Sequence, residues 1–106
     1  MNAVGPVVVD LHDMTQLAEQ GIVSKSIVEN DHHKIIHFTL APGQELSEHA
    51  ASVPAVIQII AGSGSVTLAG RRHTASAGKL YYMPAHLKHA VAADDTLVFL
   101  LTMFRT

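Results

Sequence analysis

Two short stretches carry most of the structural information in this sequence: GQELSEH at residues 43–49 and GKLYYMPAHLKH at residues 78–89. The first follows the Pro42-Gly43 pair, and the second opens on Gly78. Gly and Pro are the residues that most often end a strand and reverse the chain. Each stretch therefore places histidine shortly after a chain reversal, which makes these histidines the first candidates for a functional site.

The rest of the chain predicts short β-strands around these two stretches. From residue 21 onward, apolar and β-branched runs alternate with Gly, Pro or Asp turns every eight to twelve residues or so, a spacing typical of a sandwich or barrel. We expect strands at residues 22–28, 34–41, 53–61, 65–69, 73–77, 79–83, 89–93 and 96–104. The expected division is an N-terminal arm at residues 1–20 and a barrel domain at residues 21–106.

Only one segment predicts a helix. Within residues 10–20, apolar side chains recur at helical spacing on one face, namely Leu11, Met14, Leu17 and Ala18. Asp10 is a suitable N-cap and Gly21 a suitable C-terminal stop. The fold class expected is therefore all-β, with a short N-terminal helix.

Composition excludes several classes of protein. The 106 residues include no Cys, so there is no disulfide framework, thiolate nucleophile or thiolate zinc site. Seven Lys and Arg against nine Asp and Glu give a net charge of −2, which argues against binding to nucleic acid or to a membrane surface. Residues 1–6 have neither a cationic start nor an apolar run, so we expect no signal peptide and a cytoplasmic protein.

Two of the expected strands are apolar on both faces. Residues 97–103 read LVFLLTM, and in residues 56–60 only Gln58 interrupts the apolar run. A strand with one solvated face should alternate apolar and polar residues, so something covers the outer face. A second copy of the barrel or the N-terminal segment could do this. We expect a homodimer, also because only 15% of the residues are charged.

The spacing in the first stretch resembles the first motif of the cupin superfamily. That motif reads Gly, five residues, His-x-His, three or four residues, Glu, six residues, Gly. Gly43, His49 and Gly62 match it, whereas Ala51 stands for the second His and Ala55 for the Glu.

The second stretch resembles the second cupin motif, which reads Gly, five residues, Pro-x-Gly, two residues, His, three residues, Asn. Gly78, Pro84 and His89 match, whereas His86 stands for the Gly and Ala93 for the Asn. The resemblance extends over about residues 21–104. It implies an RmlC-like cupin domain, a double-stranded β-helix or jelly-roll barrel.

The resemblance also implies a metal site of three His and one Glu inside the barrel. His49 and His89 are the two ligands retained here, and nitrogen ligands of this kind suit Fe, Mn, Ni, Cu or Zn. A catalytic site normally keeps at least three protein ligands, so we expect at most one weakly held divalent metal. His86 is the other candidate ligand. Its position is normally Gly, which predicts a positive φ and a side chain that leaves the barrel.

These residues leave three functions open. The first is a barrel that binds a small organic molecule in an apolar pocket, with His49 and His89 as polar anchors and acid–base candidates. Either Tyr81 or Tyr82 should face inward, and the predicted pocket consists of Phe38, Ala51, Ala55, Ile57, Ile59 and Tyr82. The second is a metal-dependent enzyme, dioxygenase-like or isomerase-like, with a reduced His set. The third is a non-catalytic dimeric barrel with a sensory or structural role.

Overall fold

A computed structural model describes residues 5–16 and 21–105 of the chain. Its regular structure is a single antiparallel β-sheet system. The strands are β1 (Ile22–Glu29), β2 (His33–Leu40), β3 (Glu45–His49), β4 (Ala55–Leu68), β5 (Arg71–Ser76), β6 (Leu80–Met83) and β7 (His89–Phe104). The all-β fold class expected from the sequence is confirmed.

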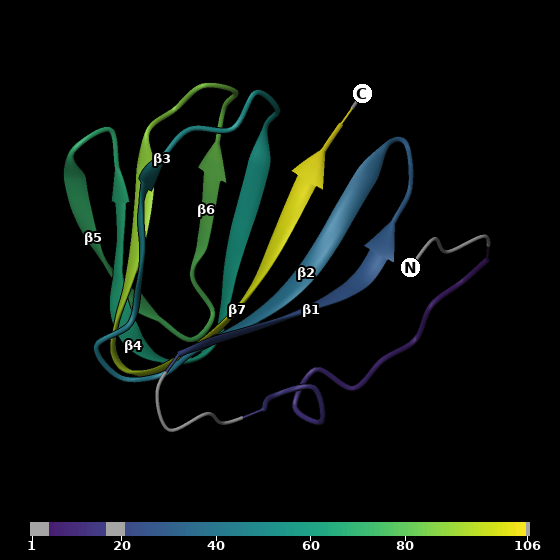
Figure 1. Cartoon of the computed structure of the whole chain (residues 1–106), viewed down its shortest axis with the longest axis horizontal. Helices are drawn as coiled ribbons and strands as arrows, with labels where there is room; N and C mark the ends of the chain where they lie inside the picture. The colour runs from purple at the N-terminus through teal and green to yellow at the C-terminus, as the bar shows by residue number, and fades with distance from the viewer. Residues whose placement is uncertain (1–4, 17–20, 106) are drawn as a thin grey trace.

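The two longest strands build both walls of the barrel. The strand order is β1-β2-β7-β4-β5, with β3 also paired to β7 and β6 to β4. Ala55 of β4 is the partner of Met103, and Leu68, at the other end of β4, is the partner of His89. Figure 1 shows β4 and β7 folded into a U, so that both ends of each strand point toward the open end of the barrel, at the top of the view.

The breaks that the sequence predicts within β4 and β7 are absent from the structure. Residues 62–64 and 94–95, which we expected to be turns, lie inside β4 and β7. They mark the bends at which each strand passes from one wall to the other, and the β4–β7 register shifts between Ile59 and Ala61 and again between Gly62 and Gly64. Strand β3 was not expected as a strand. It is short and mostly exposed.

The core fills the space between the walls. Alternate residues of each strand point inward, and Phe99 of β7 stacks on Phe38 of β2 with ring centroids 5.0 Å apart. The most completely buried apolar side chains of this core are Leu40, Ile57, Val66, Met83, Val91, Leu97 and Phe99. Burial of this apolar surface is the main force that holds the walls together.

The predicted N-terminal helix is wrong for the residues that the structure describes. Residues 11–14 form turns, in which the Asp10 side chain accepts a hydrogen bond of 3.0 Å from the His12 N–H and the Asp10 carbonyl accepts one of 3.1 Å from Asp13. An Asp side chain that bonds to nearby backbone favours a turn over a helix, and a short isolated helix is costly to start. The rest of the expected helix, residues 17–20, lies outside the described residues.

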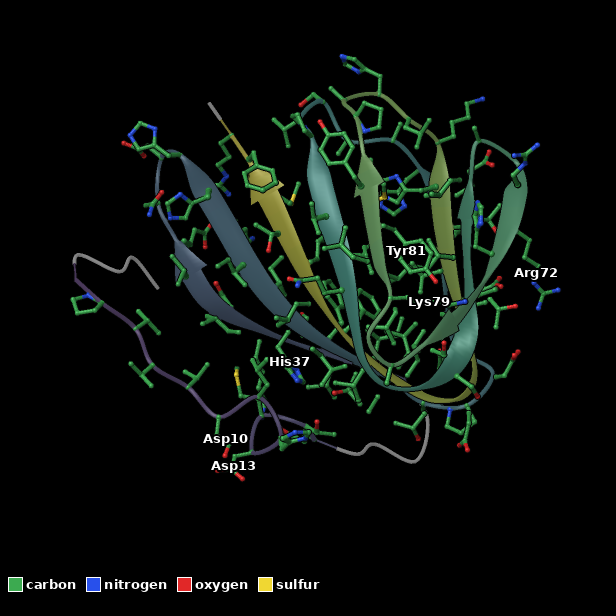
Figure 2. The ribbon with its side chains drawn as sticks, turned by 180° about the vertical axis from the view of Figure 1, so that it is seen from behind. Asp10, Asp13, His37, Arg72, Lys79 and Tyr81 are labelled. Atoms are coloured by element: carbon green, nitrogen blue, oxygen red, sulfur yellow. The ribbon has the colours of Figure 1, made fainter. Side chains whose placement is uncertain are left out.

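This N-terminal turn covers His37 on the outer face of β2. Figure 2 shows His37 between the sheet and the turn that carries Asp10 and Asp13. The His37 side chain is 1% exposed, and its Nε2 atom has no hydrogen-bond partner within the described chain. Burial lowers the pKa of His37, a hydrogen bond with the backbone of Leu11 opposes this, and the Lys25 charge adds to the lowering. At this place the chain covers its own outer face.

We expect His37 to make the fold sensitive to acid. Because its pKa is lowered in the folded state, the unfolded chain binds its proton more tightly, and stability falls as the pH drops below the ordinary value of about 6.5. Urea unfolding of the wild type and His37→Leu at pH 7.5 and 5.5 measures this effect. The wild type should lose more stability than His37→Leu between the two pH values, whereas His12→Gln, at an exposed histidine, should behave as the wild type. Equal losses in the wild type and His37→Leu would contradict the assignment.

Other parts of the outer face stay apolar and exposed. Leu80 is 58% exposed and Tyr82 57%, both on β6, and Gln58 of β4 is exposed beside them, opposite Leu80. Gln58 therefore points outward from β4. The homodimer remains a prediction, now with these side chains as its expected contact surface. Among the described residues no helix is long and apolar enough to cross a membrane.

Candidate functional site

The structure brings His49 and His89 together at the open end of the barrel. They are direct partners across the β3–β7 ladder, and their rings meet edge to face with centroids 4.2 Å apart and planes at 62°. His89 has the same inward orientation as the core residue Val91, and it is buried, whereas His49 is exposed at the rim. The pair that the sequence singled out is therefore one site with one buried and one accessible imidazole.

Backbone carbonyls fix the orientation of both rings. Nδ1 of His49 lies 2.8 Å from the Ser47 carbonyl oxygen, and Nδ1 of His89 lies 3.0 Å from the Leu87 carbonyl oxygen. A carbonyl oxygen only accepts, so in each ring Nδ1 must carry the proton and donate it. In the neutral rings the lone pair is then on Nε2, and no residue within 5–16 or 21–105 makes a hydrogen bond to either Nε2. Two hydrogen-bond acceptors of the same kind thus stand side by side.

Most of the predicted pocket residues line the inner wall. Ala55, Ile57 and Ile59 belong to the core, and Phe38 packs against it. Ala51 lies in the loop after β3, where its carbonyl accepts a hydrogen bond of 2.7 Å from the His86 N–H. The described part of the chain holds neither an enclosed cavity nor a surface pocket of ligand size.

The two tyrosines face in opposite directions, and the choice of Tyr82 for the pocket is wrong. Tyr82 is the partner of Val56 on the outer face, while Tyr81 is the partner of the core residue Ile57 and is 8% exposed. The Tyr81 hydroxyl donates a 2.8 Å hydrogen bond to the Thr74 carbonyl, and burial raises the pKa of this phenol. Tyr81 therefore stays protonated and ties β6 to β5 (Figure 2).

The backbone of His86 confirms one prediction made from the resemblance. Its φ is +69°, in the left-handed region that the usual glycine at this position adopts without strain. His86 is exposed on the loop between β6 and β7. It does not complete a ligand set with His49 and His89.

A metal centre with three or four conventional ligands does not fit this site. Within residues 5–16 and 21–105, no group of three or more His, Cys, Asp or Glu side chains could hold a metal ion. Ala51 and Ala55 stand where the resemblance places the second His and the Glu, and a methyl group cannot donate to a metal. The divalent metal considered from the sequence is therefore left with two protein ligands.

Sequence reasoning overlooked two methionines on the wall that faces the histidine pair. Met83 of β6 and Met103 of β7 are both partners of Ala55, one on each side, and both pack on the inner wall. The alternation of each strand contained the signal, because Met103 has the same parity as Phe99, and Met83 the same as Tyr81. The sequence does not show which of the two faces of each strand points into the barrel.

Comparison with known proteins identifies the family. A family model described as a cupin domain matches residues 36–103, which include both histidines of the pair. The comparison with curated proteins gave no match.

Solved structures with the same fold cover the whole chain. A conserved protein of unknown function from Streptococcus pyogenes matches 100% of this chain and 93% of its own, at 24% identity and a TM-score of 0.87. A cupin superfamily protein from Desulfitobacterium hafniense matches 100% of this chain and 97% of its own, at 20% identity and a TM-score of 0.87. KdgF from Halomonas sp. covers 97% of this chain and 96% of its own, at 22% identity and a TM-score of 0.78. These likenesses establish the fold.

Proposed function

Since this chain belongs to the cupin domain family, we propose that its function resides at the end of the barrel that carries the histidine pair, as the binding of a small organic molecule anchored by His49 and His89. The observation that carries the proposal is the orientation of the two rings. Both donate Nδ1–H to a backbone carbonyl, so Nε2 is the atom of each neutral ring that can accept a hydrogen bond from a ligand. A ligand that matches them donates hydrogen bonds, as a hydroxylated molecule does.

The wall that faces the pair supports an apolar body for this ligand. Phe38, Leu101 and Met103 pack against the core and are only partly buried. Ala51 and Ala55 are smaller than the His and Glu of the usual motif. A mostly apolar wall with a few placed polar groups is the ordinary make-up of a small-molecule site.

The same geometry suits acceptance of a proton. A neutral imidazole with its Nε2 lone pair directed at a bound hydroxyl is a general base, and the Nδ1–carbonyl bond holds the ring in the required tautomer. His49 and His89 are thus the residues to which any reaction of the bound molecule would be assigned.

We expect ligand binding to depend on both rings. Uniformly ¹⁵N-labelled protein, titrated with a panel of small hydroxylated compounds that carry apolar bodies, should show binders that shift the imidazole ¹⁵N resonances of His49 and His89. A net hydrogen bond is worth about 1 kcal/mol, so His49→Ala and His89→Ala should each weaken binding about fivefold in isothermal titration calorimetry. The double variant should weaken it more than tenfold.

Two comparisons make this test decisive. His12→Ala, at an exposed histidine of the N-terminal turn, should bind the same compounds as the wild type. Compounds that bind the double variant as tightly as the wild type would contradict the role of the pair. A panel that produces no binder with imidazole shifts would favour the non-catalytic structural barrel instead.

A further inference from the structure

The row of residues Met83, Ala55 and Met103 crosses the inner wall that faces the histidine pair. The two methionines are the cross-strand neighbours of Ala55 on its two sides. Both side chains pack on the core, and Met103 is the more exposed of the two. Because Ala55 contributes only a methyl group, no bulky side chain separates the two thioethers on this row.

The methionine row and the histidine pair lie at the same end of the barrel, on facing walls. β4 starts at Ala55 and ends at Leu68, and Leu68 is the partner of His89. Since β4 bends back on itself, both of its ends reach the open end (Figure 1). Facing sheets lie about 10 Å apart, a gap that a histidine and a methionine side chain can span together.

We propose that His49, His89, Met83 and Met103 form a binding site for monovalent copper. Thioether sulfur is a soft ligand that selects Cu(I), and imidazole nitrogen also suits copper. The two Nε2 atoms carry the lone pairs that a metal needs, while the Nδ1–carbonyl bonds supply the outer-shell support that metal-bound histidines usually have. The donor set is thus two nitrogens and two sulfurs, in place of the three nitrogens and one carboxylate that the family motif implies.

The absence of a charged ligand among these four residues distinguishes this site from one for a divalent metal. All four donors are neutral, and Ala55 stands where a carboxylate would offset the charge of the ion. A divalent ion moved from water to an apolar wall without a charged partner is strongly disfavoured, and a monovalent ion much less so. The site should therefore prefer Cu(I) to Zn(II).

The inference rests on the proposed function only in so far as both use the Nε2 atoms of the histidine pair. The thioethers are needed for copper alone, since an apolar ligand body packs against leucine as well as against methionine. Methionine-to-leucine changes conserve volume and are well tolerated in cores. These variants therefore distinguish the two uses of the site.

The test titrates the full chain with Cu(I) under anaerobic, reducing conditions, in competition with bicinchoninate. We expect about one equivalent of Cu(I) per chain, with both nitrogen and sulfur neighbours of copper in X-ray absorption spectra. Met83→Leu and Met103→Leu should each weaken Cu(I) binding about tenfold or more, and the double variant should lose the sulfur signal. Met14→Leu, in the N-terminal turn, should bind Cu(I) as the wild type, and Zn(II) should not displace the bound Cu(I).

Three results would overturn the copper site: far less than one equivalent of Cu(I), a spectrum without sulfur neighbours, or equal Cu(I) affinity in the wild type and the methionine double variant. Melting curves of the variants confirm that each one is folded. Hydroxylated compounds that still shift the His49 and His89 resonances while copper does not bind would end this inference and leave the proposed function intact. Copper binding without any organic binder would support the copper site and contradict the proposed binding of an organic molecule.

Discussion

Gly62→Ala should strongly destabilise the barrel. An added Cβ at Gly62 would lie 1.7 Å from the Thr96 carbonyl oxygen, and Gly62 also has a φ of +94°. The contact is with backbone at the bend of β7, so it cannot be relieved by a change of rotamer. Overpacking of a core costs about 1–3 kcal/mol and sometimes more, and the left-handed backbone adds about 1–2 kcal/mol for alanine. We expect a loss of about 3 kcal/mol or more of the free energy of unfolding, measured by urea denaturation.

Two further glycines separate the steric clash from the backbone strain. Gly70 has a φ of +79° but nothing within 4 Å of an added Cβ, whereas at Gly64 the Cβ would meet the Ala92 carbonyl oxygen at 2.1 Å without a left-handed φ. Gly70→Ala should therefore lose only about 1–2 kcal/mol, and Gly64→Ala clearly more. If Gly62→Ala were as stable as Gly70→Ala, the close crossing of β4 and β7 would be wrong.

Phe99→Ala should cause a comparably large loss of stability. Phe99 is 1% exposed and stacks on Phe38 with planes 12° apart. Removal of a buried phenyl ring leaves a cavity and costs about 3–5 kcal/mol. Urea denaturation of the variant should show this loss, with little change in the slope if the fold is unchanged.

The same strand provides a matched control for this change. Phe104, the last residue of β7, is 44% exposed, and Phe104→Ala should change stability by about 0.5 kcal/mol or less. Similar losses in Phe99→Ala and Phe104→Ala would contradict the inward phase assigned to β7. That phase also places Met103 on the inner wall, so the result bears on the proposed copper site.

The fold could be predicted because the spacing of a few Gly, Pro and His residues is typical of it. Gly43, Gly62 and Gly78 all adopt a positive φ, as the glycines of the two motifs require. His86 replaces a motif glycine, and its positive φ was also predicted. Local signals of this kind survive in a single sequence. The strand content followed from the Gly and Pro spacing for the same reason.

The length of the strands could not be predicted in this way. Residues 62–64 carry the composition of a turn, yet they lie inside β4 because the chain needs glycine where it crosses β7 at close range. A turn and a close crossing both demand glycine, and the sequence does not distinguish them. The prediction of an N-terminal helix was wrong for another reason. The Asp10 side chain can accept a backbone hydrogen bond in a turn as readily as at the start of a helix.

At the candidate site, the histidine pair was predictable and its surroundings were not. Motif spacing gave His49 and His89, but the choice between Tyr81 and Tyr82 depends on the phase of β6, which is set by its pairing with β4 at Ala55 and Met83. Alternation fixes which residues share a face, but not which face is inside. For the same reason, the inward orientation of Met83 and Met103 could not be predicted.

The account depends most on the claim that both imidazoles carry the proton on Nδ1 and therefore have the lone pair on Nε2. Long-range ¹H–¹⁵N spectra of the ligand-free protein, assigned through His49→Ala and His89→Ala, measure this directly. The account predicts that the neutral form of each ring carries its proton on Nδ1, as the carbonyls of Ser47 and Leu87 require. A proton on Nε2 of either ring would contradict it, because that nitrogen could then neither accept a hydrogen bond nor bind a metal.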